Sequence, residues 1–454
     1  EEIIDKGQAF GDSNIGEGKK VQIEFVSANP TGPLHIGHGR GAAVGDTLAR
    51  IMSSAGFDVT REYYINDVGN QMNTLGRSLK YRYLELLGGT EPFPDDHYKG
   101  EYMKDIAKDF ITKFGDKYKD SKDEELTEVF TSFASDSILS GIKKDLKDFG
   151  ITFDQWFSEE KLHREKLVEK TMDELRASGY VYDEDGATWF GSESLGDDKN
   201  RVLRKQDGSL TYFAADIAYH KNKIERGFDK IIDVWGADHH GYKGRVDALM
   251  KALGQEPEKL EIIFIQLVSL LRDGVPVAMS TRAGEFITLN EVLKEVGSDA
   301  CRFSFLMRKS DAQLEFDLEV AKKQAPENPV YYVQYCFARI RSIIDFAKES
   351  GIEVDKKNTK ELIKKLDAPD ELALIKYLAS FEEMIEKSSI EMAPHRVTFY
   401  LQDLAGQFHS YYNKNRIVGE DKKLSEARLL LASVVAGVVK KGLSLLGVSA
   451  PEKM

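Results

Sequence analysis

The sequence predicts an α/β fold built on a parallel sheet, followed by a separate all-α bundle of helices. Two observations predict the sheet: an apolar strand–helix–strand unit near the start of the chain, and a buried strand with polar residues at its end near the middle. A third predicts the bundle, because the apolar pattern becomes wholly helical from Pro326 onward. At 454 residues, the chain is long enough for several domains.

The first unit begins with a strand over residues 21–26, in which apolar side chains alternate and Glu24 lies on the opposite face. A helix with an apolar stripe follows and ends at Gly56. A second β-rich segment, 59–65, completes a βαβ unit. Residues 1–89 are therefore predicted to form the first half of a Rossmann-type domain.

Residues 90–205 are predicted to form a subdomain inserted between the two halves of that domain. They are rich in Lys, Asp and Glu, have apolar residues at helical spacing, and include a short strand at 187–190. The second half of the domain, 206–265, is predicted to resume with a strand at 210–213 and a helix from about Asp216.

A buried strand at 231–235 follows and also ends in polar residues. Ligands of open α/β sheets lie beyond the carboxyl ends of the strands, so both strand ends are candidate binding sites. His35 and His38 follow the first strand, and His239 and His240 follow this one, which accounts for four of the nine histidines. This clustering of histidines at strand ends indicates a functional role for both ends.

Residues 266–325 are predicted to connect the sheet domain to the helical bundle. A strand over 262–271 runs into this region, and Asp273 with Gly274 predicts a hairpin turn after it. Residues 326–454 are predicted to form the bundle. Its amphipathic segments lie near residues 329–349, 371–388, 393–413 and 425–446.

Composition narrows the class of protein. The net charge of −13 does not favour a nucleic-acid partner, although binding needs only a local basic surface. No apolar run is long enough to span a membrane, and no signal peptide is evident. Cys301 and Cys336 are the only cysteines and have no zinc-site spacing. We expect a cytoplasmic protein with no zinc or other resident metal.

The histidines His35 and His38 lie in a glycine-rich segment where the first strand gives way to the helix. The N–H groups at a helix N-terminus attract phosphate, and two histidines there can donate hydrogen bonds to phosphoryl oxygens. Gly37 and Gly39 remove side chains that would keep a nucleotide from the backbone. We predict a catalytic phosphate site; the alternative is a pair of ordinary polar residues at a helix cap.

Residues 33–38, PLHIGH, resemble the HIGH signature of class I aminoacyl-tRNA synthetases. The longer run from Glu24 through Asn29 to His38, followed by 41–46, is similar to the bacterial arginyl-tRNA synthetases, and the resemblance covers essentially the whole chain. It implies a reaction in which ATP and L-arginine form arginyl-adenylate and pyrophosphate, and tRNA(Arg) then accepts the arginine and AMP is released. It further implies that Mg²⁺ enters with ATP and that His35 and His38 stabilise the α-phosphate.

A pocket that selects arginine needs fixed carboxylates and neutral acceptors, because a guanidinium is planar, always charged and carries five N–H donors. From the residues alone, Glu24 as surface charge and Asp216 as a helix cap remain alternatives. The resemblance implies that Tyr212 and Asp216 hold the guanidinium and that Asn29 and His35 lie near the α-carboxylate and α-amino end. The end that Glu24 contacts stays open. The arginine-binding candidates are Glu24, Asn29, His35, Tyr212, Asp216 and His240.

A second class I signature, the KMSKS loop, is matched in position by residues 279–282. Ala278 and Thr281 stand where the resemblance calls for lysines. We expect Arg282, Mg²⁺ and backbone N–H groups to neutralise the pyrophosphate instead. The ATP-binding candidates are His35, Gly37, His38, Gly236, Asp238, Met279, Ser280 and Arg282.

Two stretches of the helical region, 328–341 and 408–416, mix aromatic and basic residues. This pattern is typical of proteins that bind single-stranded RNA by stacking, and core aromatics with solvated charges are the alternative. The resemblance implies an anticodon-binding domain, with Tyr332, Tyr412 and Met454 as tRNA-binding candidates.

Family members usually carry an additional N-terminal domain that contacts the tRNA elbow, and we expect it to be absent here because Glu1 starts just before the catalytic domain. The partners expected are tRNA(Arg), L-arginine and ATP, with no membrane, and the protein is expected to be a monomer. Two alternative functions stay open: a non-catalytic or crippled tRNA-binding fragment, and a class I synthetase for another polar amino acid.

Overall fold

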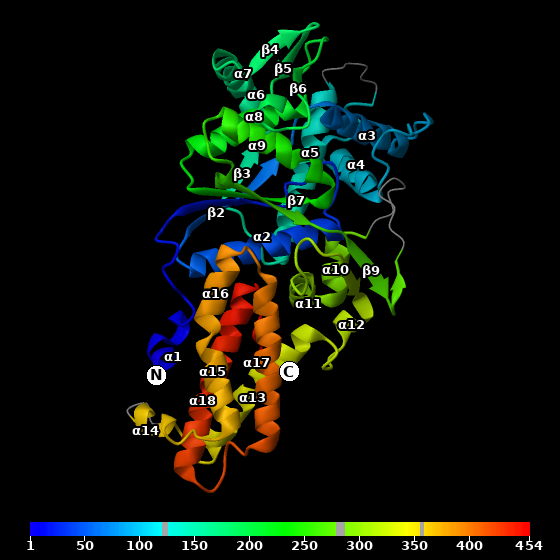
Figure 1. Cartoon of the computed structure of the whole chain (residues 1–454). Helices are drawn as coiled ribbons and strands as arrows, with labels where there is room; N and C mark the ends of the chain where they lie inside the picture. Colours follow the sequence, from blue (N-terminus) through cyan, green and yellow to red (C-terminus); the bar gives the residue numbers. More distant parts are fainter. Residues whose placement is uncertain (120–125, 278–286, 355–357) are drawn as a thin grey trace.

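The computed structural model describes residues 1–119, 126–277, 287–354 and 358–454. Figure 1 shows an elongated molecule, with the sheet and its covering helices at one end and long helices of a bundle at the other. The N-terminal helix α1 (Glu2–Lys6) and the following turn η1 (Gly7–Ala9) lie beside the bundle (Figure 1).

The sheet half of the molecule is organised around a five-stranded sheet of order β3-β2-β1-β7-β8, in which all neighbours are parallel. Glu24 of β1 is in register with Glu62 on one side and with Asp233 on the other, so three carboxylates form a row across the sheet. The strands are β1 (Lys20–Glu24), β2 (Asp58–Ile65), β3 (Gln155–Ser158), β7 (Lys230–Gly236) and β8 (Leu260–Ile265).

Helix α2 (Ile36–Ser54) links β1 to β2 and confirms the predicted βαβ unit. It lies between the sheet and the bundle (Figure 1). A Cβ at Gly45 would come within 2.3 Å of the Phe25 ring, so glycine lets the helix pack directly on the sheet. The chain then reverses at Gly56, whose φ of +87° suits glycine.

Two differences from the predicted organisation concern the second half of the domain. The predicted strand at 210–213 is wrong: helix α8 (Tyr212–Glu225) begins there, because Phe213 and Ile217 are spaced for a helix face and both are buried. Strand β3 falls inside the predicted insertion, yet it pairs with β2 and belongs to the parallel sheet.

The other elements of this half cover the sheet or form a small antiparallel sheet of order β4-β5-β6, in which β5 reproduces the predicted strand at 187–190. The antiparallel strands are β4 (Val181–Glu184), β5 (Ala187–Phe190) and β6 (Arg201–Arg204). The helices are α3 (Asn70–Leu86), α4 (Glu101–Phe114), α5 (Leu126–Asp148), α6 (Glu159–Arg164), α7 (Leu167–Ala177) and α9 (Lys243–Ala252).

The predicted strand over 262–271 is two strands in two different sheets, and that prediction was wrong. The chain turns at Gln266, whose carbonyl accepts a 2.9 Å hydrogen bond from buried Arg40 and whose N–H donates to Ser310. The predicted hairpin at Asp273 is confirmed. The connecting elements are β9 (Val268–Arg272), β10 (Val275–Pro276), α10 (Leu289–Val296), α11 (Ser298–Phe305), β11 (Leu314–Asp317) and α12 (Leu318–Lys322).

The C-terminal helices reproduce the predicted amphipathic segments, except that the segment 371–388 is two helices separated at Ser380. Buried Arg302 joins bundle and sheet domain, because it donates to the Leu446 carbonyl at 2.7 Å and pairs with Asp46 of α2. The bundle helices are α13 (Pro329–Glu349), α14 (Thr359–Ile363), α15 (Pro369–Ala379), α16 (Phe381–Ile390), α17 (His395–Lys414) and α18 (Lys422–Leu445). Among the described residues, none of the helices is both long and apolar enough to cross a membrane.

Candidate active site

The histidines His35 and His38 form a stacked pair at the start of α2. Their ring centroids lie 3.7 Å apart and their planes are inclined by 22°. The Nδ1 of His35 accepts a hydrogen bond from the Gly37 N–H at 3.1 Å, and the Nδ1 of His38 accepts from the His35 N–H at 3.2 Å. The pair therefore caps the helix and fixes its own geometry at the same time.

These hydrogen bonds also determine which ring nitrogen carries the proton. Because both Nδ1 atoms accept, the proton of each neutral ring lies on Nε2, the atom farthest from the helix. Burial and the neighbouring His35 lower the pKa of His38 to about 3, and burial lowers the pKa of His35. Both rings are neutral at pH 7 and present N–H donors at a helix N-terminus, as required for stabilising a phosphate.

The histidine pair lines a cavity of about 360 Å³. The opposite wall comes from residues 95–102, anchored where the Tyr102 hydroxyl donates to the Thr31 carbonyl at 2.7 Å. Thr288, which caps α10, forms a β-bridge with His35. The candidates Met279, Ser280 and Arg282, with Ala278 and Thr281, lie outside the described residues.

A second cavity, of about 520 Å³, lies over the carboxyl ends of β1 and β7. Asn29 lines both cavities, so they are neighbours. The second cavity brings together five of the predicted site residues, and four carboxylates line it. Its lining includes Glu24, Asn29, Tyr212, Asp216 and Gly236 from the prediction, and Tyr64, Glu159, Tyr219, Asp233 and Tyr242, which sequence reasoning missed.

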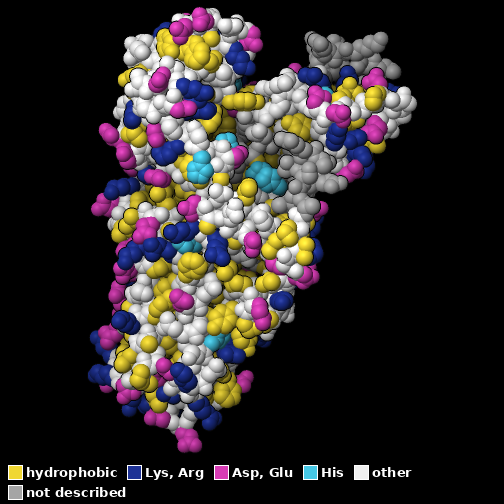
Figure 2. Space-filling model, turned by 45° about the vertical axis from the view of Figure 1, so that its right-hand side comes forward, with side chains coloured by type: hydrophobic (Ala, Val, Ile, Leu, Met, Phe, Trp, Pro, Cys, Tyr) yellow, Lys and Arg dark blue, Asp and Glu magenta, His cyan; other side chains and the backbone are white. Residues whose placement is uncertain are grey.

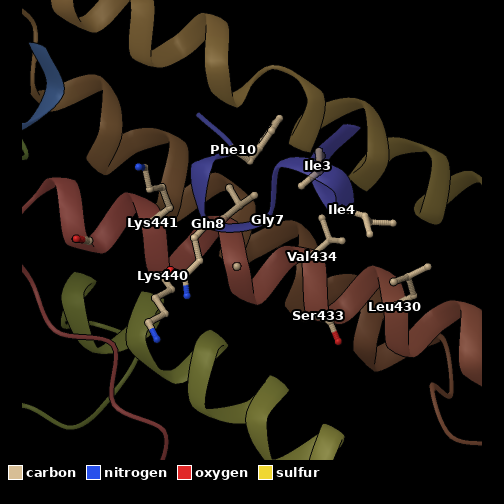
Figure 3. A pocket seen from close by; sticks show the side chains of 13 residues that line it. Ile3, Ile4, Gly7, Gln8, Phe10, Leu430, Ser433, Val434, Lys440 and Lys441 are labelled. Carbon is tan, nitrogen blue, oxygen red and sulfur yellow. The ribbon is translucent and has the colours of Figure 1, made fainter. Parts of the chain in front are cut away.

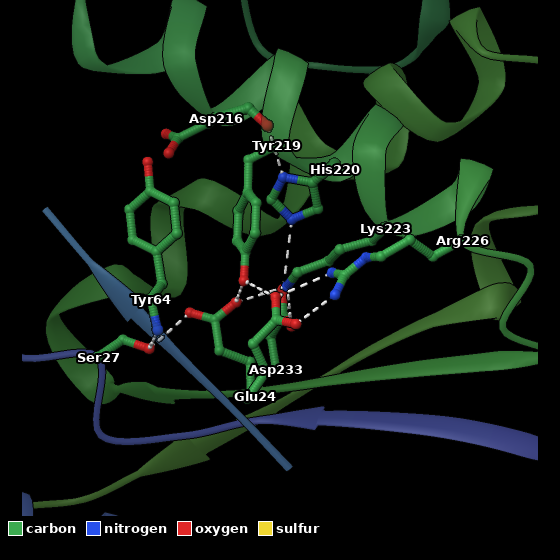
Figure 4. Close-up of polar contacts among 10 residues, drawn as sticks. Glu24, Ser27, Tyr64, Asp216, Tyr219, His220, Lys223, Arg226 and Asp233 are labelled. Carbon is green, nitrogen blue, oxygen red and sulfur yellow. Dashed lines mark hydrogen bonds and ion pairs between the residues drawn. The ribbon is translucent and has the colours of Figure 1, made fainter. Parts of the chain in front are cut away.

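Asp216 and Glu159 are the acidic groups at one end of this cavity. Burial and the nearby Glu159 raise the pKa of Asp216 to about 6. Burial also raises the pKa of Glu159, which accepts a 2.7 Å hydrogen bond from the Tyr64 hydroxyl. The Asp216 carboxylate and the Tyr64 hydroxyl face the same space in Figure 4. Burial therefore disfavours the charged form of both carboxylates, and a cation bound between them would offset that cost.

Glu24, at the other end, is already engaged by protein groups. Its Oε2 accepts from Tyr219 at 2.8 Å and from Lys223 at 2.6 Å, and its Oε1 accepts from Ser27 at 2.7 Å (Figure 4). Tyr212 is 60% exposed and lies at the mouth of the cavity. Glu24 is therefore buried at the floor of the cavity instead of being a surface charge.

The strand end after β7 departs in part from the prediction. Gly236 lines the cavity, but Asp238 and His240 are exposed and do not. His240 stacks on Phe264, with ring centroids 3.8 Å apart, and His239 lines the cavity in its place. Figure 2 shows histidine side chains grouped at a hollow in the surface of the sheet half.

A third cavity, of about 650 Å³, lies between the N-terminal segment and α18 (Figure 3). Its lining is mostly apolar, with Ile3, Phe10, Leu430 and Val434 among the side chains, and Lys440 near one end. None of the predicted site residues is among them. The charged substrates predicted here fit the other two cavities better. Within the described residues, no cluster of three or more His, Cys, Asp or Glu could hold a metal ion.

On the bundle, α13 and α17 bring two of the predicted tRNA-binding residues together. The Tyr332 ring lies 4.9 Å from that of His409, and the Arg339 guanidinium lies 5.2 Å above the Tyr412 ring. Arg339 also covers Tyr335, at 4.6 Å. Met454 is half-exposed and lines a separate cavity of about 440 Å³.

Comparison with known proteins decides the family. The family model for the class I (R) tRNA synthetase catalytic domain matches residues 2–322, and that for the DALR anticodon binding domain matches residues 333–454. The chain belongs to the arginyl-tRNA synthetases of class I. The expectation of a Rossmann-type catalytic domain followed by an all-α anticodon-binding domain is thereby confirmed.

Curated members of this family are similar over the whole chain. The arginine–tRNA ligase of Citrifermentans bemidjiense is 56% identical over 454 residues, which is all of this chain and 82% of that protein. The arginine–tRNA ligase of Syntrophotalea carbinolica is 53% identical with the same coverage.

Solved structures agree. A Campylobacter jejuni protein assigned as an arginyl-tRNA synthetase superposes with a TM-score of 0.91 at 38% identity, over 100% of this chain and 98% of that one. The Thermus thermophilus arginyl-tRNA synthetase gives a TM-score of 0.77 at 22% identity, over 100% and 86%, which shows a shared fold.

Proposed function

We propose that this chain is an arginine–tRNA ligase that joins L-arginine to ATP as arginyl-adenylate and transfers the arginine to tRNA(Arg), with release of pyrophosphate and AMP. The observation that carries the proposal is the adjacency of two sites: neutral histidines at a helix N-terminus, and an acidic cavity that shares Asn29 with them. One site suits a phosphate, and the other suits a cationic amino acid.

In the phosphate site, the Nε2–H groups of His35 and His38 donate to oxygens of the α-phosphate while the arginine carboxylate attacks phosphorus. Pyrophosphate leaves from the opposite side, as an in-line displacement requires. Because both rings are neutral donors fixed by their Nδ1 contacts, they need no reorganisation as negative charge develops. Mg²⁺ arrives with ATP as part of the substrate, and Arg282 shares the charge of the pyrophosphate.

In the acidic cavity, Asp216 and Glu159 receive the guanidinium, with Tyr212 at the mouth. Both lie in the cavity with their pKa raised by burial and without a lysine or arginine partner among the described residues, whereas Glu24 already pairs with Lys223. We therefore assign the guanidinium to Asp216 and Glu159. Glu24 is assigned to the α-ammonium end, with Asn29 and His35 close to the α-carboxylate.

The remaining site residues are assigned by their place in the fold. Gly236 and Asp238, at the end of β7, are proposed to contact the adenosine, together with Gly37, Met279 and Ser280. The ring of His240 stacks on Phe264 in this structure. We propose that this side chain moves to contact the amino acid when the substrate binds.

The bundle is proposed to bind the anticodon of tRNA(Arg). The Arg339 surface, defined as Tyr332, Tyr335, Arg339, His409 and Tyr412, offers partly exposed rings beside a guanidinium, which suits stacking of unpaired bases. Met454 is a further candidate.

The domain division that accompanies this assignment is 1–89, 90–205, 206–265, 266–325 and 326–454. The protein is proposed to act as a monomer in the cytoplasm, where tRNA and ATP are available.

Arginine binding is expected to weaken in acid, because the guanidinium binds the ionised forms of Asp216 and Glu159. Above the Asp216 pKa of about 6 the carboxylate is already ionised, and below that pH the binding of arginine must displace a proton from it. The dissociation constant is then expected to rise about tenfold per pH unit for each proton displaced. Calorimetric titration with arginine between about pH 8 and pH 5 measures it. A dissociation constant that stays flat through this range would exclude the assigned carboxylates.

Arginine-dependent exchange of label between pyrophosphate and ATP tests the proposed function. We expect exchange with arginine, and none with lysine or glutamate, because lysine has a point charge and no planar fork for two carboxylates. The resemblance further predicts that exchange needs tRNA(Arg), so the assay is run with and without it. Exchange supported by another polar amino acid, or the absence of exchange with tRNA binding retained, would favour one of the alternative functions instead.

A further inference from the structure

Lys223 is a completely buried lysine that the reaction as described does not use. It extends from α8 to the sheet, where its Nζ lies 2.6 Å from Oε2 of Glu24 and 2.6 Å from Oδ1 of Asp233 (Figure 4). Glu24 and Asp233 are register partners on the adjacent strands β1 and β7. Both carboxylates line the amino-acid cavity, and Lys223 does not, so the ammonium lies beneath the floor of that cavity.

Glu24, Asp233 and Lys223 form what we call the floor cluster. The polar groups around it form hydrogen bonds or ion pairs with its members or with each other. The Tyr219 hydroxyl lies 2.8 Å from Oε2 of Glu24 and 2.5 Å from Oε1 of Glu62, so its one proton is shared between the two carboxylates, and Arg226 pairs with Glu62. On the Asp233 side, Nε2 of His220 lies 3.3 Å from Oδ2. Ser27, an uncharged group, donates to Glu24. Among the described residues, Tyr219, His220 and Lys223 are the titratable groups that contact Glu24 or Asp233.

The pKa shifts of Lys223 and Asp233 indicate that the two side chains form an ion pair in spite of their burial. Burial would lower the pKa of Lys223 and raise that of Asp233, but their contact outweighs burial and shifts both the other way. Two carboxylates facing each other without a cation would share a proton. Lys223 lies between them, within 2.6 Å of an oxygen of each, so one cation is shared by two carboxylates.

We propose that Lys223 is a positioning residue for arginine activation: it pairs with Glu24 and Asp233 together and fixes both carboxylates at the cavity floor, where one net negative charge meets the substrate α-ammonium. This inference rests on the proposed function, since it assigns the floor to the α-ammonium of arginine. A merely structural lysine would stabilise the fold but would not set the pH dependence of arginine binding.

The test compares Lys223→Met with Lys221→Met in arginine-dependent exchange in the presence of tRNA. Lys221 lies on the same helix and pairs with Glu174 and Glu225 at the surface, so its variant is expected to behave as wild type. For Lys223→Met we expect the KM for arginine at about pH 7 to rise roughly tenfold to 100-fold, with the KM for ATP nearly unchanged. Part of this loss is expected to be recovered by about pH 8, because the shared proton then leaves while the α-ammonium of arginine stays largely charged.

Each outcome has a separate meaning. A wild-type protein without arginine exchange overturns the proposed function and this inference with it. If wild type exchanges and Lys223→Met shows an unchanged KM for arginine, or an increase with no alkaline recovery, Lys223 has no positioning role.

A double variant guards against loss of folding in the single one. Lys223→Met with Asp233→Asn removes one cation and one anion together, which preserves the charge balance of the buried cluster. We expect it to melt cooperatively and to show a KM for arginine with no alkaline recovery, because only one floor carboxylate remains. Alkaline recovery in this variant would overturn the proposal, since no pair is left to share a proton.

Discussion

Replacing His38 by asparagine is expected to lower the rate of arginine activation about 10²- to 10³-fold, the effect of removing one fixed donor from a developing oxyanion. The asparagine side-chain oxygen reaches the position of Nδ1, so it can still accept from the His35 N–H that Nδ1 now receives at 3.2 Å. It cannot reach the position of Nε2. The helix cap is kept while the proposed catalytic donor is lost.

His38→Gln is the matched control for that variant, because a glutamine amide reaches the position of Nε2 instead of Nδ1. We expect it to retain more activity than His38→Asn although it loses the cap. The measurement is pre-steady-state formation of arginyl-adenylate, with the melting temperature of each variant beside it. Equal rates for the two variants, or a rate that follows melting temperature alone, would assign His38 to folding.

Asp216→Asn is expected to raise the KM for arginine about 10²- to 10³-fold, because a charge-assisted hydrogen bond is lost and a buried N–H₂ group meets a guanidinium. Asp216 lines the cavity, and its pKa of about 6 shows how strongly burial there disfavours an unpaired charge. The KM for ATP is expected to change little, since the histidine pair proposed to bind its α-phosphate lines the neighbouring cavity.

Glu225→Gln provides the control on the same helix. Glu225 pairs with Lys221 at the surface and does not line the cavity, so this variant is expected to match wild type. Steady-state exchange with varied arginine measures both. An Asp216→Asn protein with an unchanged KM for arginine would move the guanidinium site away from Asp216 and Glu159.

The spacing of apolar residues along the chain was sufficient to predict strands and helices whose pattern is regular over neighbouring residues. Residues 231–235 were predicted as a buried strand and lie in β7, and the helical segment 329–349 matches α13. The prediction of a strand at 210–213 failed because Tyr212 and Phe213 are both β-formers, whereas Phe213 also fits the buried apolar face of α8, and the packing of that face decided the outcome.

The acidic cavity shows why part of the site could not be predicted. Glu159 follows a four-residue strand inside a region that looked like an insertion, and only the pairing of β3 with β2 brings it to the cavity. The short apolar run ahead of it, with a polar residue at its end, was the available signal. Lys223 had none: in sequence it resembles its surface neighbour Lys221, and only the fold distinguishes them.

The most direct test of the account is a crystal structure of the protein with a non-hydrolysable arginyl-adenylate analogue. We expect the guanidinium between Asp216 and Glu159, the α-ammonium at Glu24 and the phosphate surrogate within hydrogen-bond distance of Nε2 of His35 and His38. An analogue bound with its guanidinium at Glu24, or with its phosphate surrogate away from both histidines, would contradict the assignment of the two cavities.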